Sequence, residues 1–188
     1  MMLGRVALVG AFWGAMGFTV ACSRSGDTKR AAQTSRDTSS TLHALTIGAP
    51  VPAYDVTTLR DSVVHLGGTQ DDVTILNVWA TWCTECREEM ALLDTVARQT
   101  RKEHVRVISV SVDQSIAPVR QFAQIAKPSF VIGYDARHEF EQSYSVVALP
   151  TTYVIGRDGH LVWQHTGSVV AVRHELSAAI DQAENPQR

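Results

Sequence analysis

The residues of this chain whose types and spacing could do chemistry are Cys83 and Cys86, a pair separated by Thr84 and Glu85. They follow the apolar run Val73–Trp79, which is typical of a buried strand, and they open a stretch that is typical of a helix. On a helix, positions three apart share a face at about 5–6 Å, a separation that a disulfide can close. A helix N-terminus offers free N–H groups and partial positive charge, which stabilise a thiolate. The pattern therefore predicts a redox dithiol, with Cys83 as the attacking thiol and Cys86 as the resolving thiol.

Two other uses of this pair are open, half of a zinc site or a purely structural disulfide. Structural zinc normally takes four Cys or His ligands at recognisable spacings, and the chain has three cysteines, the third being Cys22. A cross-link that closes a very short loop adds little stability, because the stabilisation grows with loop length. Both facts favour the redox dithiol, and we expect neither a metal nor a cofactor at this site.

The N-terminus has the pattern of an export signal. Arg5 gives a short basic region, and Val6–Ala21 is uncharged and mostly apolar, yet shorter than the ~20 residues that span a bilayer comfortably. The run ends in a small residue, Ala21, followed by Cys22. This resembles a bacterial lipoprotein signal peptide, although Thr19 stands where leucine is commonest. The resemblance implies cleavage after residue 21 and a lipid on Cys22; ordinary signal-peptide cleavage and an uncleaved anchor are the alternatives.

Residues 22–42 have the composition of a flexible tether. Of the nineteen residues from Ser23 to Thr41, nine are Ser or Thr and six are charged, and none is a large apolar residue. Such a segment cannot bury enough surface to fold. Residues 43–188 remain, and these ~145 residues suffice for one hydrophobic core.

The charge pattern excludes one class of partner. The formal net charge is −2, and both signs are scattered along the chain without a basic stripe or basic–aromatic interleaving. Nucleic acid is therefore not an expected partner.

Apolar spacing and turn residues along residues 43–188 predict an alternation of strands and helices. Strands are expected at Val56–Leu59, Ser62–Leu66, Val73–Trp79, Val105–Val112, Phe130–Ile132, Thr151–Ile155 and Leu161–His165. Helices are expected at Thr84–Arg101, Pro118–Ala126, Arg137–Tyr144 and Val169–Ala183. This order implies an α/β fold with a central mixed β-sheet and helices on both faces.

Four motifs together resemble the TlpA/ResA-like exported thiol-disulfide oxidoreductases of the thioredoxin superfamily. They are Asn77–Cys83 with Cys86, Glu89-Met90, Val107–Asp113, and Leu149–Ile155 followed by Asp158-Gly159. The resemblance extends from about Ile47 to Ile180. It implies a thioredoxin-like fold and thiol–disulfide exchange through a mixed disulfide on Cys83, which Cys86 resolves.

Pro150 matches the cis-proline that faces the dithiol in this family. The resemblance implies a cis Leu149–Pro150 bond, which turns the Leu149 backbone toward an extended substrate that adds by main-chain hydrogen bonds. A trans proline that starts a strand is the alternative.

Asn77 stands where cytosolic thioredoxins carry a buried acidic residue, and asparagine cannot take a proton. Some other base must then manage the Cys86 proton, and Glu89 lies three residues after Cys86 on the same predicted helical face. In the ResA-like group the matching glutamate lies near the dithiol, where burial would raise its pKa. The alternative is a solvated helix glutamate, like its neighbour Glu88.

The chain departs from the family at two positions. The dipeptide between the cysteines, Thr84-Glu85, contains no proline, and Ala91 stands where the family often has a helix-kinking proline. The first departure bears on the redox potential and the second on the helix geometry.

The resemblance implies a membrane-tethered thiol-disulfide oxidoreductase in the bacterial cell envelope, facing the periplasm. Its partners would be protein thiols and disulfides, for example in cytochrome c maturation or copper-site assembly, and a transmembrane electron donor. A peroxiredoxin-like peroxidase is one alternative, although such an enzyme would place a lone cysteine after threonine. A non-catalytic copper chaperone is another, although copper chaperones of this fold use a wider cysteine spacing and a downstream histidine.

Overall fold

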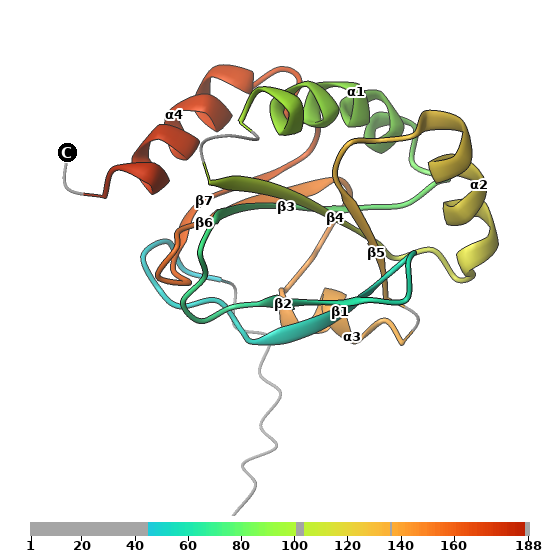
Figure 1. Ribbon diagram of the computed structural model, residues 1–188, viewed down its shortest axis with the longest axis horizontal. Coiled ribbons are helices and arrows are strands. Elements are labelled where there is room, and N and C mark those ends of the chain that lie inside the picture. Colours follow the sequence, from blue (N-terminus) through green and yellow to red (C-terminus); the bar gives the residue numbers. More distant parts are fainter. Residues whose placement is uncertain (1–44, 101–103, 136, 187–188) are drawn as a thin grey trace, which may run out of the picture. The chain divides into compact units, whose positions relative to one another are not determined.

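The computed structural model describes residues 45–100, 104–135 and 137–186 (Figure 1). The chain divides into two units, Met1–Ser39 and Ser40–Arg188, and the described residues belong to the second. The predicted signal peptide (residues 1–21), the predicted tether (residues 22–42) and the predicted lipidation site Cys22 lie outside the described residues.

Seven strands of the described residues form one mixed sheet in the order β2-β1-β5-β4-β3-β6-β7. The pairs β3–β4 and β4–β5 are parallel, and the other neighbouring pairs are antiparallel. The strands are β1 (Tyr54–Thr58), β2 (Val63–Leu66), β3 (Val73–Trp79), β4 (Val105–Ser111), β5 (Val131–Tyr134), β6 (Thr151–Ile155) and β7 (Leu161–Thr166). The helices are α1 (Thr84–Gln99), α2 (Ile116–Ala126), α3 (Glu139–Ser143) and α4 (Arg173–Glu184).

The central strands β3 and β4 are continuous apolar runs because both of their faces are covered. Every residue of β3 is buried, and β3 runs in register with β4 from Val73 opposite Val105 to Trp79 opposite Ser111. The dithiol follows directly after this strand in the chain. The best-packed strand of the sheet therefore anchors the residues that could do chemistry.

Alternate side chains of these strands point into two apolar clusters, one on each face of the sheet. Ile75 and Trp79 pack with α1, α2 and α4, whereas Leu76 and Val78 pack with α3 through Phe140. In Figure 1, α1 and α4 accordingly lie above the central strands, α2 lies at the right, and α3 lies below. The predicted α/β fold with helices on both faces is confirmed.

Two helices begin at residues that differ from the prediction. Helix α2 begins at Ile116, two residues before Pro118, because proline is tolerated in a first turn, where its missing N–H would have no partner in the helix. Helix α4 begins at Arg173 rather than Val169. The N–H of Val169 instead donates to the carboxylate of Glu89, so this residue belongs to a loop and not to the helix.

Smaller differences concern the ends of other elements. Strand β5 is shifted toward Tyr134, which pairs with both β1 and β4. Helix α3 begins only at Glu139, because the left-handed backbone of His138 precedes it. The chain turns between strands at Asp61 (φ 58°) and at Gly159 (φ 79°), where the left-handed backbone favours glycine or aspartate.

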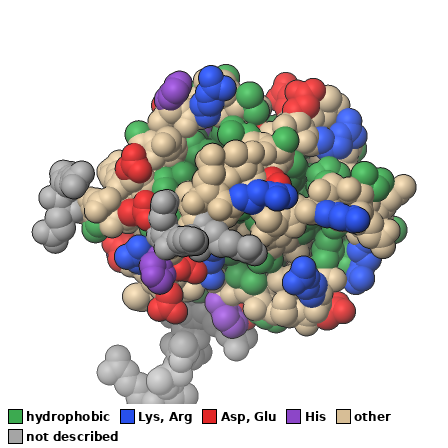
Figure 2. Space-filling model, turned by 45° about the horizontal axis from the view of Figure 1, so that its top comes forward, with side chains coloured by type: hydrophobic (Ala, Val, Ile, Leu, Met, Phe, Trp, Pro, Cys, Tyr) green, Lys and Arg blue, Asp and Glu red, His purple; other side chains and the backbone are tan. Residues whose placement is uncertain are grey.

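The surface mixes both signs of charge. Figure 2 shows one face, on which basic and acidic side chains are interspersed with hydrophobic and other groups. Among the described residues, no helix is both long enough and apolar enough to cross a membrane.

Candidate active site

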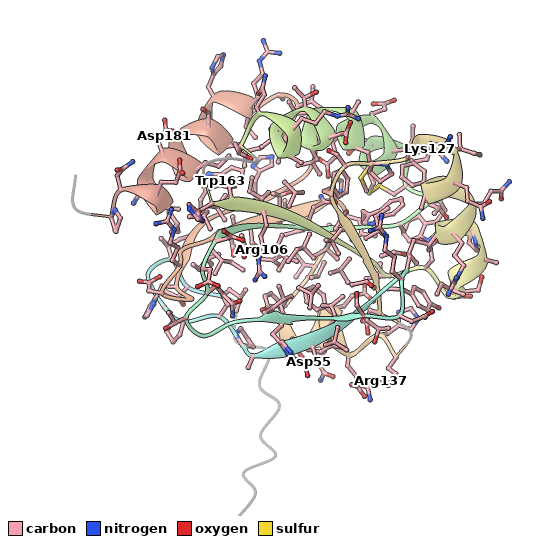
Figure 3. All side chains as sticks on the ribbon, in the orientation of Figure 1. Asp55, Arg106, Lys127, Arg137, Trp163 and Asp181 are labelled. Atoms are coloured by element: carbon pink, nitrogen blue, oxygen red, sulfur yellow. A yellow bond between two sulfur atoms is a disulfide. The ribbon has the colours of Figure 1, made fainter. Side chains whose placement is uncertain are left out.

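Cys83 and Cys86 are joined by a disulfide (the yellow bond in Figure 3), with an S–S length of 2.02 Å and Cα atoms 5.2 Å apart. Cys83 is the N-cap of α1, and its sulfur accepts a hydrogen bond from the Cys86 N–H over 3.2 Å. Cys83 is half-buried, whereas Cys86 has no exposed surface. An N–H of the first helical turn therefore faces the sulfur atom of the cysteine that is in part accessible to solvent.

The buried carboxylate of Asp113 fixes the loop between β3 and Cys83. It accepts hydrogen bonds from the N–H of Thr81 over 2.9 Å, from the Thr81 hydroxyl over 2.6 Å and from the Ser111 hydroxyl over 2.7 Å. Arg87 donates to the carbonyl of Thr81 over 2.9 Å from the other side. Asp113 was not among the predicted site residues, although a charged residue just after a buried strand was a usable signal.

Glu89 lies on the buried face of α1, one turn after Cys86, and its side chain has no exposed surface. Its Oε1 accepts a hydrogen bond from Asn77 Nδ2 over 2.6 Å, and its Oε2 accepts one from the N–H of Val169 over 3.0 Å. Burial raises the pKa of Glu89 from its ordinary value of 4.5 to about 7, against the opposing effect of these two hydrogen bonds. Glu89 is thus a buried carboxyl group and not a solvated helix glutamate like its neighbour Glu88.

Asn77 is the centre of a buried polar row that crosses the sheet. In register, Ser109 of β4 lies opposite Asn77 of β3, and Asn77 lies opposite Thr152 of β6. The Ser109 hydroxyl donates to Asn77 Oδ1 over 2.7 Å, and Asn77 Nδ2 also lies 3.2 Å from Thr152 Oγ1. Ser109 and Thr152 were not among the predicted site residues; the signal for each was a polar residue inside an otherwise apolar strand.

Pro150 lies at the start of β6, and the Leu149–Pro150 peptide bond is cis, as predicted. The Pro150 carbonyl accepts a hydrogen bond from the N–H of Gly167 over 2.8 Å. Leu149 and Cys83 are both partly buried and pack against the same two apolar clusters. The fold therefore brings the proline segment to the same end of the sheet as the dithiol.

A groove of about 860 Å³ runs between the dithiol loop and the segment before Pro150. Its apolar lining includes Trp82, which is 67% exposed, and Val147, which is 86% exposed. Asp113, Glu141 and the imidazole of His138 also line it. Neither cysteine lines the groove itself, but Trp82 directly precedes Cys83 in the chain. Exposed apolar side chains of this kind mark surfaces to which protein segments bind.

The residues that the structure describes hold no cluster of three or more His, Cys, Asp or Glu side chains that could bind a metal ion. The described site consists of the Cys83–Cys86 disulfide, the buried carboxyl group of Glu89 and the neighbouring groove.

Residues 47–164 match the family model of the AhpC/TSA family. The chain belongs to the AhpC/TSA family. Within it, this AhpC/TSA protein places Cys83 and Cys86 three residues apart at the start of α1 and joins them in a disulfide.

Related sequences carry the names of thiol-disulfide oxidoreductases. The AhpC/TSA protein is 26% identical over 161 residues to the thiol-disulfide oxidoreductase ResA of Bacillus cereus, across 86% of this chain and 85% of the relative. It is 29% identical over 131 residues to the thiol:disulfide interchange protein DsbE of Haemophilus influenzae, across 68% of this chain and 70% of the relative.

A solved structure from Chlorobium tepidum, described as a thiol:disulfide interchange protein DsbE, aligns with a TM-score of 0.71 at 24% identity. The alignment covers 76% of this chain and all of the other. StoA from Bacillus subtilis aligns with a TM-score of 0.59 at 19% identity, over 70% of this chain and 98% of the other. These likenesses establish the thioredoxin-like fold that the sequence predicts.

Proposed function

We propose that this protein is a thiol-disulfide oxidoreductase that reduces disulfides in exported proteins. The observation that carries the proposal is the pairing of a half-exposed Cys83 at a helix N-terminus with a fully buried Cys86 one turn later. This asymmetry gives one sulfur access to a substrate and shields the other until a mixed disulfide has formed.

In this proposal, thiol–disulfide exchange proceeds in two steps, attack by Cys83 and resolution by Cys86. The Cys83 thiolate attacks a substrate disulfide, forms a mixed disulfide and releases one substrate sulfur, which takes up a proton. Cys86 then loses its proton and attacks the Cys83 sulfur, which releases the second substrate thiol and leaves Cys83 and Cys86 oxidised. Two electrons pass to the substrate, so an external dithiol donor must reduce the protein again.

Glu89 is the group that we propose takes the proton of Cys86. A carboxylate with a pKa of about 7 is matched to the proton that a thiol gives up near neutral pH. Glu89 is buried one turn after Cys86, where the solvent cannot reach the proton directly. Asn77, which replaces the acidic residue of cytosolic thioredoxins, cannot serve because its amide does not titrate.

The groove beside the dithiol is the proposed binding site for an extended substrate segment. The main chain at Leu149 would pair with the substrate backbone, while substrate side chains pack against Trp82 and Val147. The carboxylates of Asp113 and Glu141 line the same groove and disfavour acidic residues next to the target cysteine.

The reducing direction and the partners follow from the resemblance to TlpA/ResA-like proteins. We propose that the substrates include apocytochrome c or copper-site proteins and that a transmembrane dithiol donor supplies the electrons. The names of the relatives, thiol-disulfide oxidoreductase ResA and thiol:disulfide interchange protein DsbE, agree with thiol–disulfide chemistry.

The proposed location is the periplasmic side of a bacterial membrane. In this proposal, residues 1–21 are removed as a signal peptide, Cys22 carries a lipid, and residues 22–42 tether the folded domain 43–188. The test is mass spectrometry of the mature N-terminus. A diacylated Cys22 supports the proposal, and an unmodified Cys22 or a different mature N-terminus removes it.

A trapping experiment tests the proposed function. In Cys86→Ser the mixed disulfide cannot be resolved, so substrates stay bound to Cys83 and appear as species on non-reducing gels that a reducing agent releases. The matched control, Cys83→Ser, keeps Cys86 as the sole thiol of the pair and should trap nothing, because Cys86 is buried. Equal trapping by both variants, or none by either, would reject the proposed mechanism.

A further inference from the structure

The buried polar row around Asn77 has a fixed direction. Ser109, Asn77, Thr152 and Glu89 each have no exposed surface, so water cannot rearrange their hydrogen bonds. The Ser109 hydroxyl has one proton, and it lies 2.7 Å from Asn77 Oδ1 but 3.9 Å from Met90 Sδ, a much weaker acceptor. In the structure the carbonyl end of the Asn77 amide faces Ser109, and Oδ1, the nearer and stronger of the two acceptors, takes the hydroxyl proton.

This direction decides what the other end of the amide presents to Glu89. Because Oδ1 is occupied by Ser109, Nδ2 points toward Glu89 Oε1 at 2.6 Å and toward Thr152 Oγ1 at 3.2 Å. An amide N–H can only donate. The second oxygen of Glu89 likewise meets a donor, the N–H of Val169. Both carboxyl oxygens are thus held as acceptors, which favours the ionised form of Glu89.

We propose that Ser109 and Asn77 are positioning residues that hold Glu89 ready to accept a proton, with Ser109 acting only through the orientation of the Asn77 amide. The relevance of this positioning to catalysis rests on the proposed function, in which Glu89 takes the proton of Cys86. We call the Ser109 hydroxyl and the Asn77 amide together the hydroxyl–amide relay. Both groups are neutral, whereas cytosolic thioredoxins carry an acidic residue at the position of Asn77.

Several groups around Glu89 act on its pKa, and the hydroxyl–amide relay is one of them. Burial raises the pKa of Glu89, and the hydrogen bonds from Val169 and Asn77 lower it. Glu85, one turn before Glu89 on α1, is the charged side chain whose field adds to the upward shift. Asn77, Ser109 and Thr152 of the strands below it do not titrate, and Cys86 on α1 is the thiol that it would serve.

The sharpest test compares the pKa of Glu89 in two variants, Ser109→Ala and Thr152→Val, each of which removes one hydroxyl group from the polar row. Ser109→Ala leaves Asn77 Oδ1 without a donor, so the amide can rotate and accept a hydrogen bond from protonated Glu89. The pKa of Glu89, read from its carboxyl carbon by NMR in the oxidised protein, should rise by about one unit. Thr152→Val removes a hydroxyl on the opposite side, where it only accepts from Nδ2, and should produce no upward shift.

A second variant guards against misfolding of the first. Asn77→Asp places a carboxyl group within hydrogen-bond distance of Glu89, so the pair must share a proton and one of its two ionisations should move above that of native Glu89. A pKa of Glu89 that is unchanged in Ser109→Ala, or raised equally in Thr152→Val, would overturn the relay.

Catalysis separates the relay from the proposed function. The rate at which Cys86 resolves a preformed mixed disulfide should depend on pH with a midpoint that moves with the pKa of Glu89 in Ser109→Ala. If the pKa moves and the rate midpoint does not, the relay stands and Glu89 is not the base for Cys86. If neither moves, the relay is wrong and the thiol–disulfide activity is untouched.

Discussion

Cys86 and Glu89 lie one turn apart on the buried face of α1, and neither side chain exposes any surface. Positions three apart on a helix bring their Cβ atoms to about 5–6 Å. A proton that leaves the Cys86 thiol during exchange therefore has Glu89 as its buried neighbour, while Cys83 at the helix start keeps its access to solvent.

Selective alkylation should distinguish the two thiols of the reduced protein. A limiting amount of iodoacetamide should label Cys83 first, because Cys83 is half-exposed at the helix N-terminus and Cys86 is buried. Peptide mapping by mass spectrometry locates the label. Preferential labelling of Cys86 would reverse the assignment of attacking and resolving thiols.

The buried carboxyl group should leave a signature in stability. The folded pKa of Glu89 is raised from 4.5 to about 7, so the native state binds its proton more tightly than the unfolded state does. The stabilisation by this proton is full below pH ~4.5 and is lost as the pH rises to ~7, a total of roughly 3 kcal/mol.

The variant Glu89→Gln should lack this loss, since glutamine does not titrate. Urea unfolding of the oxidised protein at several pH values measures the free energy of unfolding. The matched control is Glu88→Gln, which removes the carboxylate of the exposed neighbour. Equal slopes of unfolding free energy against pH in Glu89→Gln and Glu88→Gln would show that Glu89 titrates normally.

The carboxylate of Glu85, which lies between the two cysteines in the chain, should influence the reduction potential of the Cys83–Cys86 disulfide. Glu85 lies in the first turn of α1, where its carboxylate disfavours the Cys83 thiolate by about as much as the helix dipole favours it, roughly 1 kcal/mol. We expect a potential nearer to that of thioredoxin, about −270 mV, than to that of the oxidant DsbA, about −120 mV.

Titration against glutathione redox buffers measures this potential. Glu85→Gln removes the carboxylate and should raise the potential by about 20 mV. A native potential above roughly −180 mV, the isomerase value, would contradict a reductase and indicate an oxidant or an isomerase.

Substrate binding should depend on the aromatic side chain that precedes Cys83. Trp82→Ala removes a 67% exposed indole from the groove and should raise the KM for a disulfide-bonded protein about tenfold, with a smaller change in kcat. Steady-state reduction of insulin provides the measurement. Ile125→Ala removes a 76% exposed side chain that does not line the groove, and a matching rise in KM there would refute the groove as the substrate site.

The sequence predicted the parts of this site that depend on local patterns. The apolar run Val73–Trp79, the cysteine spacing and the motif around Pro150 each specify a local conformation, and the structure contains all three. The burial of Glu89 was predictable from its position three residues after Cys86, because the helical period places both on one face.

The partners of Glu89 could not be predicted in the same way. Ser109 and Thr152 come from strands 32 and 75 residues away from Asn77 in the chain, and their meeting depends on the register of β4 and β6 against β3. The start of α4 was also predicted wrongly, at Val169 instead of Arg173. Val169 fits the helical period of apolar residues, but its N–H donates to Glu89. Such tertiary hydrogen bonds leave no periodic pattern in the sequence.

The most direct test of the account is a single turnover of the fully reduced protein with an equimolar disulfide-bonded protein such as insulin, quenched in acid and analysed by mass spectrometry. We expect one insulin disulfide to be reduced for each Cys83–Cys86 disulfide that forms, and Cys83→Ser to abolish the reaction. A reduced protein that leaves insulin intact but is oxidised rapidly by hydrogen peroxide would refute the thiol–disulfide mechanism and indicate a peroxidase.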